Sequence, residues 1–245
     1  MRKFEDPKNL QVHFLDERFY EVGDGQFYPS VTTILDVYPK GTAFLQWVKD
    51  VGNNARMIAE RAAESGTKVH NACEMLMNGE ELTWDDREYN FEEWNGVLRF
   101  HDFATRFKPH WEAIEVATIS HKYRYAGTVD IVCLIGDTRW MLDIKFGNAI
   151  YDTYFLQLAA YRQSWEENNP EHPIHKMGVL HLKASTRTEG KKGSMQGVGW
   201  KVEQPKDSYD KLFDVFEKTL GIYFFDNPDP RPKNLTLPSV LKLDL

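Results

Sequence analysis

The sequence predicts an α/β fold, more closely an α+β sandwich in which helices flank a central mixed β-sheet. Apolar residues follow a helical spacing through most of residues 42 to 107. After residue 109 the spacing changes to the period of two that is typical of strands. A helical segment and two more strand-like stretches follow, and this order favours a mixed sheet covered by helices.

Length and composition indicate a single domain. A chain of 245 residues with 42% apolar and 13% aromatic residues can build one full hydrophobic core. We divide it into an N-terminal hairpin and helical part (1–108), a part that forms the sheet with its helices (109–225) and a tail (226–245).

The N-terminal part is expected to hold a small hairpin or meander followed by helices. Residues 11 to 28 alternate aromatic or aliphatic with polar side chains, and Ser30 can cap a short helix. Gly66 is expected to end one long helix, with Thr67 capping the next. The helical segments are expected at 42–63 with a break near 52–54, at 67–79 and at 85–107.

The C-terminal part is expected to supply the sheet. Strands are predicted at 111–120, 123–135, 139–146, 177–182 and 198–202. A helix after Gly147 and an amphipathic helix at 209–225 complete the expected elements. The last residues, 235–243, could form an edge strand, and simple packing on the domain is the favoured alternative.

Charge, cysteine content and hydropathy exclude several classes of protein. A formal charge of −7 argues against a broadly basic surface, so a nucleic-acid partner would need local positive charge or a bound metal ion. Cys73 and Cys133 are too few for an iron–sulfur cluster, and none is expected. The start lacks a signal peptide, and no segment is long enough to span a membrane. We therefore expect a cytoplasmic protein without a membrane partner.

Two neighbouring strands place acids and a base at one end of the expected sheet. Asp143 and Lys145 share one face of a strand, because side chains alternate along it. A hairpin would bring Asp130 beside Asp143. These carboxylates and the carbonyl of Ile144 would suit Mg²⁺ or Mn²⁺, and Lys145 could orient or deprotonate a water or offset negative charge. An Asp-x-Lys triplet alone is more often a solvated ion pair.

Four motifs in one order extend this site. They are Gly66-Thr67-Lys68-Val69-His70, Gly127-Thr128-Val129-Asp130, Asp143-Ile144-Lys145 and Gln157-Leu158-Ala159-Ala160-Tyr161. In this order they resemble the RecB-like branch of the PD-(D/E)XK nuclease superfamily. The segment Tyr28 to Leu35 is also similar to the beginning of stand-alone phage and mitochondrial genome-maintenance exonucleases of that branch. The resemblance covers about residues 28 to 165.

The resemblance implies a single nuclease domain with a restriction-endonuclease-like core, acting as a metal-dependent DNA exonuclease. It implies that His70, Asp130, Asp143 and the Ile144 carbonyl hold one or two Mg²⁺ or Mn²⁺ ions, with Lys145 as the catalytic lysine. Taken alone, His70 is more often a hydrogen-bonded residue on a helix face. The alternatives are a structure-specific or restriction-like endonuclease with the same site and a nucleic-acid-binding protein without turnover.

The resemblance also implies supporting roles for three residues. Glu115 takes the place of an extra acidic residue that holds metal or water, with an ordinary salt bridge as the alternative. Gln157 and Tyr161 match a Gln-x-x-x-Tyr motif whose helix positions the lysine and the substrate. Tyr161 also belongs to an apolar stripe and can pack in the core. DNA is the implied partner, with a recombination or single-strand-binding protein as a second one and a bacterial host cytoplasm if the chain is phage-encoded.

Two basic stretches are candidates for contacts with a phosphate backbone. The segment from Lys183 to Lys201 interleaves cations with glycines, and the tyrosines beside Lys122 and Arg124 could stack on bases. A solvated loop is the alternative for the first stretch. The candidate nucleic-acid contacts are Lys122, Arg124, Lys183, Arg187, Lys191 and Lys192.

Overall fold

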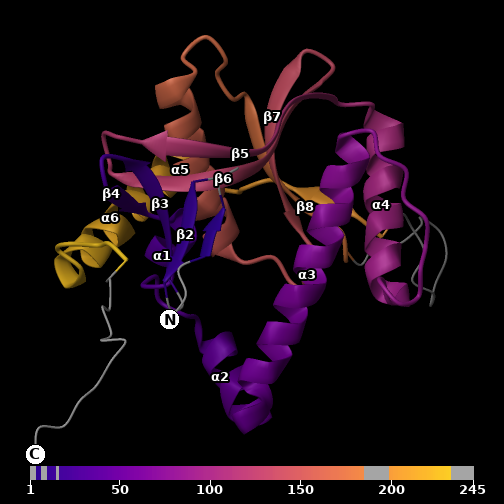
Figure 1. The fold of residues 1–245 in the computed structure, drawn as a ribbon, viewed down its shortest axis with the longest axis horizontal. Helices are drawn as coiled ribbons and strands as arrows, with labels where there is room; N and C mark the ends of the chain where they lie inside the picture. Colours follow the sequence, from indigo (N-terminus) through magenta and orange to yellow (C-terminus); the bar gives the residue numbers. More distant parts are fainter. Residues whose placement is uncertain (1–3, 7–9, 15–16, 185–198, 233–245) are drawn as a thin grey trace, which may run out of the picture.

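A five-stranded mixed sheet flanked by helices forms the body of the protein in the computed structural model (Figure 1). The structure describes residues 4–6, 10–14, 17–184 and 199–232. This architecture confirms the predicted fold class. The tail at 235–243 lies outside the described residues.

The N-terminal residues form a small antiparallel sheet, as predicted for the meander. Its strands follow one another in the order of the chain, β1 (Phe4–Asp6), β2 (Gln11–Phe14), β3 (Glu17–Gly23) and β4 (Gln26–Pro29). Asp24 and Gly25, which connect β3 to β4, both have positive φ angles, the conformation that tight hairpin turns require.

Ser30 links this small sheet to the body. Its Oγ accepts a hydrogen bond from Thr33 N at 3.0 Å and so caps α1 (Val31–Leu35), as predicted. Ser30 also forms an isolated parallel bridge with Ala126 of β6. Tyr20 and Tyr28 pack with Ala126 in one buried cluster. The N-terminal sheet is therefore anchored to the beginning of β6 in the large sheet.

The predicted break at residues 52–54 is confirmed, but the predicted break at Gly66 is wrong. A 3-10 turn (Gly52–Asn54) separates α2 (Thr42–Val51) from α3 (Ala55–Met77). Helix α3 runs through Gly66 and Thr67, where the Thr67 hydroxyl donates to the carbonyl of Ala63 at 3.0 Å instead of capping a new helix. Glycine inside a helix costs only about 1 kcal/mol, which burial of the following turns can offset.

Helix α4 (Phe91–Phe107) begins later than the predicted residue 85. Asn90 accepts hydrogen bonds from the backbone N–H groups of Glu92 and Glu93, and the Glu93 side chain accepts one from Asn90 N. This reciprocal capping box fixes the helix start.

The large sheet has the strand order β5-β6-β7-β8-β9, with one parallel pair, β7 with β8. Its strands are β5 (His110–Ser120), β6 (Tyr125–Ile135), β7 (Thr138–Lys145), β8 (Lys176–His181) and β9 (Lys201–Glu203). Helix α5 (Asp152–Asn168) makes the crossover from β7 to β8. The predicted strands are confirmed, the last one beginning three residues later than the expected 198.

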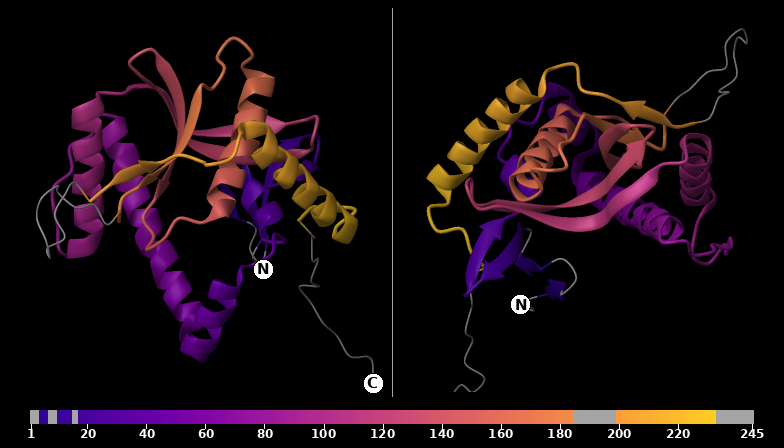
Figure 2. Two further views of the ribbon diagram at one scale, coloured as in Figure 1. Left: turned by 180° about the vertical axis from the view of Figure 1, so that it is seen from behind. Right: turned by 90° about the horizontal axis from the view of Figure 1, so that it is seen from above.

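Helices cover both faces of the sheet. Helices α5 and α6 (Tyr209–Asp226) lie on one face, and α3 and α4 on the other (Figure 2, right). A buried cluster that includes Val132, Leu158 and Phe216 fills the first layer. A second cluster, which includes Val69, Phe100 and Leu142, fills the other.

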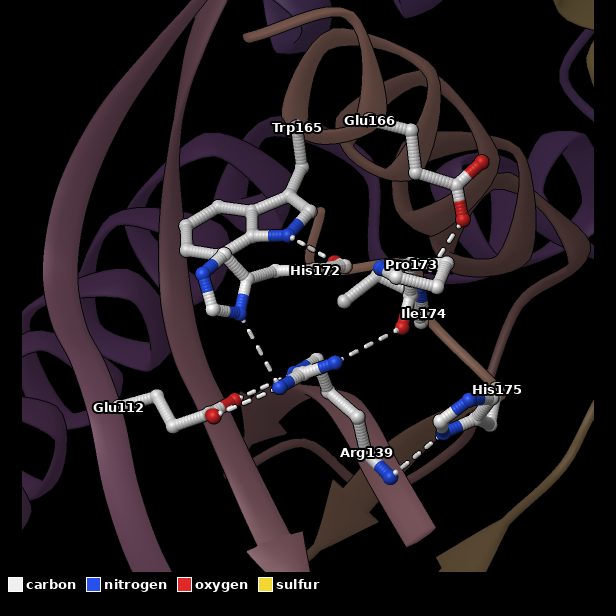
Figure 3. A network of polar contacts seen from close by, with 8 residues as sticks. All are labelled: Glu112, Arg139, Trp165, Glu166, His172, Pro173, Ile174 and His175. Atoms are coloured by element: carbon white, nitrogen blue, oxygen red, sulfur yellow. Dashed lines mark hydrogen bonds and ion pairs between the residues drawn. The ribbon is translucent and has the colours of Figure 1, made fainter. Parts of the chain in front are cut away.

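A polar network ties the far end of the sheet to the loop before β8 (Figure 3). Arg139 of β7 contacts both carboxylate oxygens of Glu112 on β5, at 2.5 and 2.8 Å. Arg139 Nη2 also lies 3.2 Å from His172 Nδ1, and its backbone N–H donates to His175 Nδ1 at 3.0 Å. The network fixes the strand register at the end opposite the candidate site.

Candidate metal centre

Three acidic residues lie in a row across three adjacent strands. Glu115 of β5 falls between the paired positions Ile114–Ile131 and Val116–Val129, which places it opposite Asp130 of β6. The β6–β7 pairing ends at Ile131–Leu142. Asp130 and Asp143 are the next residues on the two strands, so the acids meet where the β6–β7 ladder stops.

Asp130 itself ends that ladder. Its Oδ2 accepts a hydrogen bond from the backbone N–H of Ile144 at 2.7 Å. The side chain thereby pairs with the Ile144 amide, which would otherwise need an acceptor on a neighbouring strand. Asp130 is only 8% exposed. A buried carboxylate held by a backbone amide keeps one orientation, which is a requirement for a metal ligand.

Glu115 departs from strand geometry. Its φ of 50° lies in the left-handed region, which a non-glycine residue in a strand rarely adopts. Such a conformation costs on the order of 1 kcal/mol and is concentrated at functional sites. The distortion occurs where the Glu115 side chain meets His70.

His70 of α3 lies between two of the acids. Its Nδ1 is 3.2 Å from Glu115 Oε1, and its Nε2 is 2.9 Å from Asp130 Oδ2. One possible ligand atom from each of these three residues lies within 4.8 Å of the others. Their carboxylate oxygens suit Mg²⁺ or Mn²⁺, and an imidazole nitrogen suits Mn²⁺ better. The set therefore fits a divalent cation.

The pKa shifts show which groups balance the negative charge of the acidic residues when no metal ion is bound. Burial lowers the pKa of His70, but Asp130 and Glu115 outweigh it and raise that pKa to about 9. Burial raises the pKa of Asp130, but the His70 imidazolium, Lys145 and the Ile144 amide hold it below its ordinary value. A charged imidazolium thus neutralises these carboxylates, and a metal ion would replace its proton.

Asp143 belongs to a second, adjoining cluster. Its Oδ2 lies 2.7 Å from Lys145 Nζ, and its Oδ1 accepts a hydrogen bond from Gln157 Nε2 at 3.0 Å. Gln157 Nε2 also donates to the Tyr161 hydroxyl at 3.0 Å. Among the described residues, the metal-ligand group contains Glu115 rather than Asp143. Direct ligation by Asp143 and by the Ile144 carbonyl stays a prediction.

Lys145 and Asp143 influence each other through burial and charge. Burial raises the pKa of Asp143 to about 6, the nearby Asp130 carboxylate adds to that rise, and Lys145 opposes it. Burial lowers the pKa of Lys145, but Asp143 and Asp130 outweigh it and raise that pKa above its ordinary value. Lys145 is therefore an ammonium group with its charge directed at the acids.

The Gln157–Tyr161 pair is held by close packing. A Cβ added to Gly127 would lie 2.2 Å from Tyr161 Cε1, so only glycine leaves room for this ring. Tyr161 is 4% exposed and belongs to the core shared by α5 and the sheet. Its ring packs in the core, which confirms the core interpretation, and its hydroxyl contacts Gln157. A role in positioning the lysine and the substrate stays a prediction.

One cavity of about 590 Å³ is lined by most of these groups, namely His70, Glu115, Asp130, Lys145, Gln157 and Tyr161, whereas the buried Asp143 is not part of its lining. Helix α3 contributes Gly66, Thr67 and His70 to its lining, and the N-terminal sheet and α1 contribute Gln11, Arg18 and Thr32. Sequence analysis did not identify Arg18, because no motif marks it and its distance from Asp130 along the chain hides their proximity.

The predicted nucleic-acid contacts lie in different places. Lys183 lines a cavity of about 430 Å³ that shares Phe146 and Gly147 with the candidate site, and its Nζ lies 2.8 Å from Glu92 Oε1. Arg124 stacks over Phe224 and lines a separate cavity, and Lys122 Nζ lies over the Tyr123 ring. Arg187, Lys191 and Lys192 lie outside the described residues.

Comparison with known proteins leaves the site to be interpreted from its own chemistry. Among the residues described, no helix combines the length and the apolar character that a membrane crossing requires. No protein-family model and no curated protein matches this chain.

Proposed function

We propose that this protein is a metal-dependent DNA exonuclease that hydrolyses phosphodiester bonds, a PD-(D/E)XK enzyme of the RecB-like branch. One observation carries the proposal: His70, Glu115 and Asp130 converge within 4.8 Å beside the Asp143–Lys145 pair. A histidine and carboxylates that converge on one point, with a lysine alongside, match the needs of phosphodiester hydrolysis better than those of a structural ion pair.

The three converging residues would hold Mg²⁺ or Mn²⁺, with Asp143 and the Ile144 carbonyl next to them. A cation bound there supplies Lewis acidity towards a phosphoryl oxygen and lowers the pKa of a bound water. Asp130 is suited to this role because the Ile144 amide fixes its carboxylate. His70 is suited because α3 brings its ring between two carboxylates.

Lys145 acts as a cation rather than as a base. Its pKa is raised, so the ammonium group stays charged at neutral pH and can donate hydrogen bonds to phosphate oxygens. This interaction strengthens as negative charge grows on the phosphoryl group in the transition state. The same ammonium group, 2.7 Å from Asp143, can also orient the attacking water.

The reaction is a hydrolysis that needs no further co-reactant. The oxygen of water forms a bond to phosphorus, and the bond to the 3′-oxygen breaks. The departing 3′-oxygen takes up a proton, which leaves a 3′-hydroxyl and a 5′-phosphate. Gln157 contributes by holding Asp143 while it also contacts Tyr161. The requirement for a DNA end rests on the family resemblance alone, because nothing in the motifs themselves requires an end.

End-labelled linear DNA and closed circular DNA, each incubated with Mg²⁺ or with EDTA, test the proposal. An exonuclease degrades the linear DNA only, and only with Mg²⁺. Nicking of the circles would identify an endonuclease instead. Binding without cleavage of either DNA would identify a nucleic-acid-binding protein. The variant Asp130→Asn, purified in parallel, controls for contaminating nucleases, because it should be inactive on both substrates.

A further inference from the structure

Arg18 of β3 is a cation in the candidate site that no motif assigns. It lines the same cavity as His70, Asp130 and Lys145. Its Nε is buried and donates a hydrogen bond to no group among the described residues. A buried polar donor without a protein partner costs free energy, so this group is available to an acceptor that a ligand brings into the cavity.

Other cations of similar burial show how this protein normally pairs such groups. Lys145 contacts Asp143, and Arg139 contacts both oxygens of Glu112. Both side chains are shielded from solvent, at 23% and 12% exposure. In contrast, the Nε of Arg18 has no hydrogen-bond partner among the described residues. Arg18 lines the cavity of the candidate site.

The backbone of Arg18 is fixed in place. Its N–H donates to Thr33 Oγ1 at 2.9 Å, and the same hydroxyl donates to the Arg18 carbonyl at 3.1 Å. That carbonyl also accepts a hydrogen bond from Ser30 N at 2.9 Å. Two donors and one acceptor from the N-cap and first turn of α1 thus hold the residue. A fixed backbone reduces the entropy lost when the side chain binds a ligand.

The charge of Arg18 reaches the polar groups of the site. Burial raises the pKa of Tyr20, whereas a hydrogen bond with Thr128, the charge of Arg18 and a hydrogen bond with the Arg18 side chain oppose the rise. Burial also raises the pKa of Tyr161, and Arg18 is the cation that opposes this. Tyr161 contacts Gln157, which in turn contacts Asp143. Arg18 and Lys145 line the same cavity, so the charge of Arg18 acts within the candidate site.

We propose that Arg18 forms a phosphate-binding subsite next to the candidate metal centre. A guanidinium group offers a planar fork of N–H donors that matches the oxygens of a phosphate. The ligand is a phosphate of the nucleic-acid strand, either a terminal monoester or an internal diester. This inference rests on the proposed function, and it adds a residue that holds the strand in register with the centre.

The acids nearby make this subsite depend on metal. Glu115 and Asp130 would repel a phosphate unless a divalent cation balances their charge. Arg18 therefore contributes most to binding when the metal centre is loaded. Lys183, in the adjoining cavity, is already paired with Glu92, so an approaching phosphate has to displace a carboxylate there. The Nε of Arg18 has no such competitor among the described residues.

Fluorescence anisotropy of a labelled oligonucleotide tests the subsite, with Ca²⁺ present to load the centre without rapid hydrolysis. The variants are Arg18→Met, Arg18→Lys and, as a matched control, Arg106→Met on the exposed Arg106–Asp102 pair. We expect Arg18→Met to weaken binding by about tenfold, because a charge-assisted hydrogen bond is lost. Arg18→Lys should fall between it and the parent, and Arg106→Met should bind as the parent does.

Two forms of the oligonucleotide distinguish the source of the phosphate. A loss seen only with a 5′-phosphate, and not with a 5′-hydroxyl, identifies the terminal monoester. An equal loss with both forms identifies an internal diester. If the parent cleaves and binds DNA while Arg18→Met binds equally well, the subsite is refuted and the nuclease proposal stands. If the parent neither cleaves nor binds DNA, both proposals are refuted.

Discussion

His70 Nε2 lies 2.9 Å from Asp130 Oδ2, and this contact joins the longest helix of the described chain to β6, an interior strand of the large sheet. The other ring nitrogen faces Glu115 at 3.2 Å. An imidazole with a carboxylate at each nitrogen is charged, so it satisfies both acids when no metal is bound. A divalent cation can take over that role because it offers more charge at the same place.

Glu115→Gln should weaken Mn²⁺ binding by about tenfold or more, because the amide keeps the shape of the carboxylate and removes its charge. Calorimetric titration of parent and variant measures the change. Glu112→Gln on the same strand serves as the matched control, since Glu112 pairs with Arg139 at the other end of the sheet. Equal Mn²⁺ affinity of the Glu115→Gln variant and the parent would remove Glu115 from the ligand set.

Lys145→Ala should lower the turnover number for DNA cleavage at least about 100-fold while Mn²⁺ and DNA binding change little, because the ammonium group acts mainly on the transition state. Single-turnover cleavage and anisotropy separate the two effects. Lys211→Ala, which removes an exposed lysine paired with Asp207, should cleave as the parent does. A Lys145→Ala variant with full activity would exclude lysine from the mechanism.

Gly127→Ala and Gly66→Ala should shift stability in opposite directions. At Gly127 the new methyl group would overlap the Tyr161 ring, so we expect a loss of about 1–3 kcal/mol in the free energy of unfolding. At Gly66 the methyl group meets nothing within 4 Å inside a continuous helix, so we expect a gain of about 0.5–1 kcal/mol. Urea denaturation measures both changes. Equal stability of the Gly127→Ala variant and the parent would contradict the close packing of Tyr161.

Glu112→Gln should show a pH-dependent loss of stability. The hydrogen bond from Arg139 lowers the pKa of Glu112, against the effect of burial (Figure 3). A carboxyl group with a lowered pKa in the folded state stabilises the protein above its unfolded pKa of about 4.3, and this contribution is lost as the pH falls through the folded value.

Denaturation of parent and Glu112→Gln at several pH values tests this expectation. The difference in the free energy of unfolding should be roughly 1 kcal/mol at neutral pH and should narrow below about pH 4. Glu60→Gln removes the exposed Arg56–Glu60 pair and should change stability by less than about 0.5 kcal/mol. A difference that stays constant down to acid pH would show that Glu112 does not act through its charge.

The local pattern predicted much of the sheet and part of the site. Alternation along β7 places Asp143 and Lys145 on one face, and their 2.7 Å contact agrees with it. The short connection after Ile135 predicts the β6–β7 hairpin, and the observed pairing confirms it. Both inferences use residues close in sequence, where periodicity and turn length determine geometry.

Other features depend on contacts between distant segments. The break expected at Gly66 does not form, because Val69, Ala72 and Cys73 pack against the sheet and keep α3 continuous. The proximity of Arg18 to the acids results from the anchoring of the N-terminal sheet at Ser30 and Ala126. Periodicity contains no information about such docking, so neither feature could be read from the local pattern.

The central claim is that a divalent cation is held by His70, Asp130 and their neighbouring acid. Calorimetric titration of the purified protein with Mn²⁺, beside the Asp130→Asn variant of equal fold, tests it most directly. We expect the parent to bind at least one ion per chain and the variant to lose that binding, because the amide leaves the centre short of negative charge. Unchanged Mn²⁺ binding by the variant, or no binding by the parent, would contradict the account.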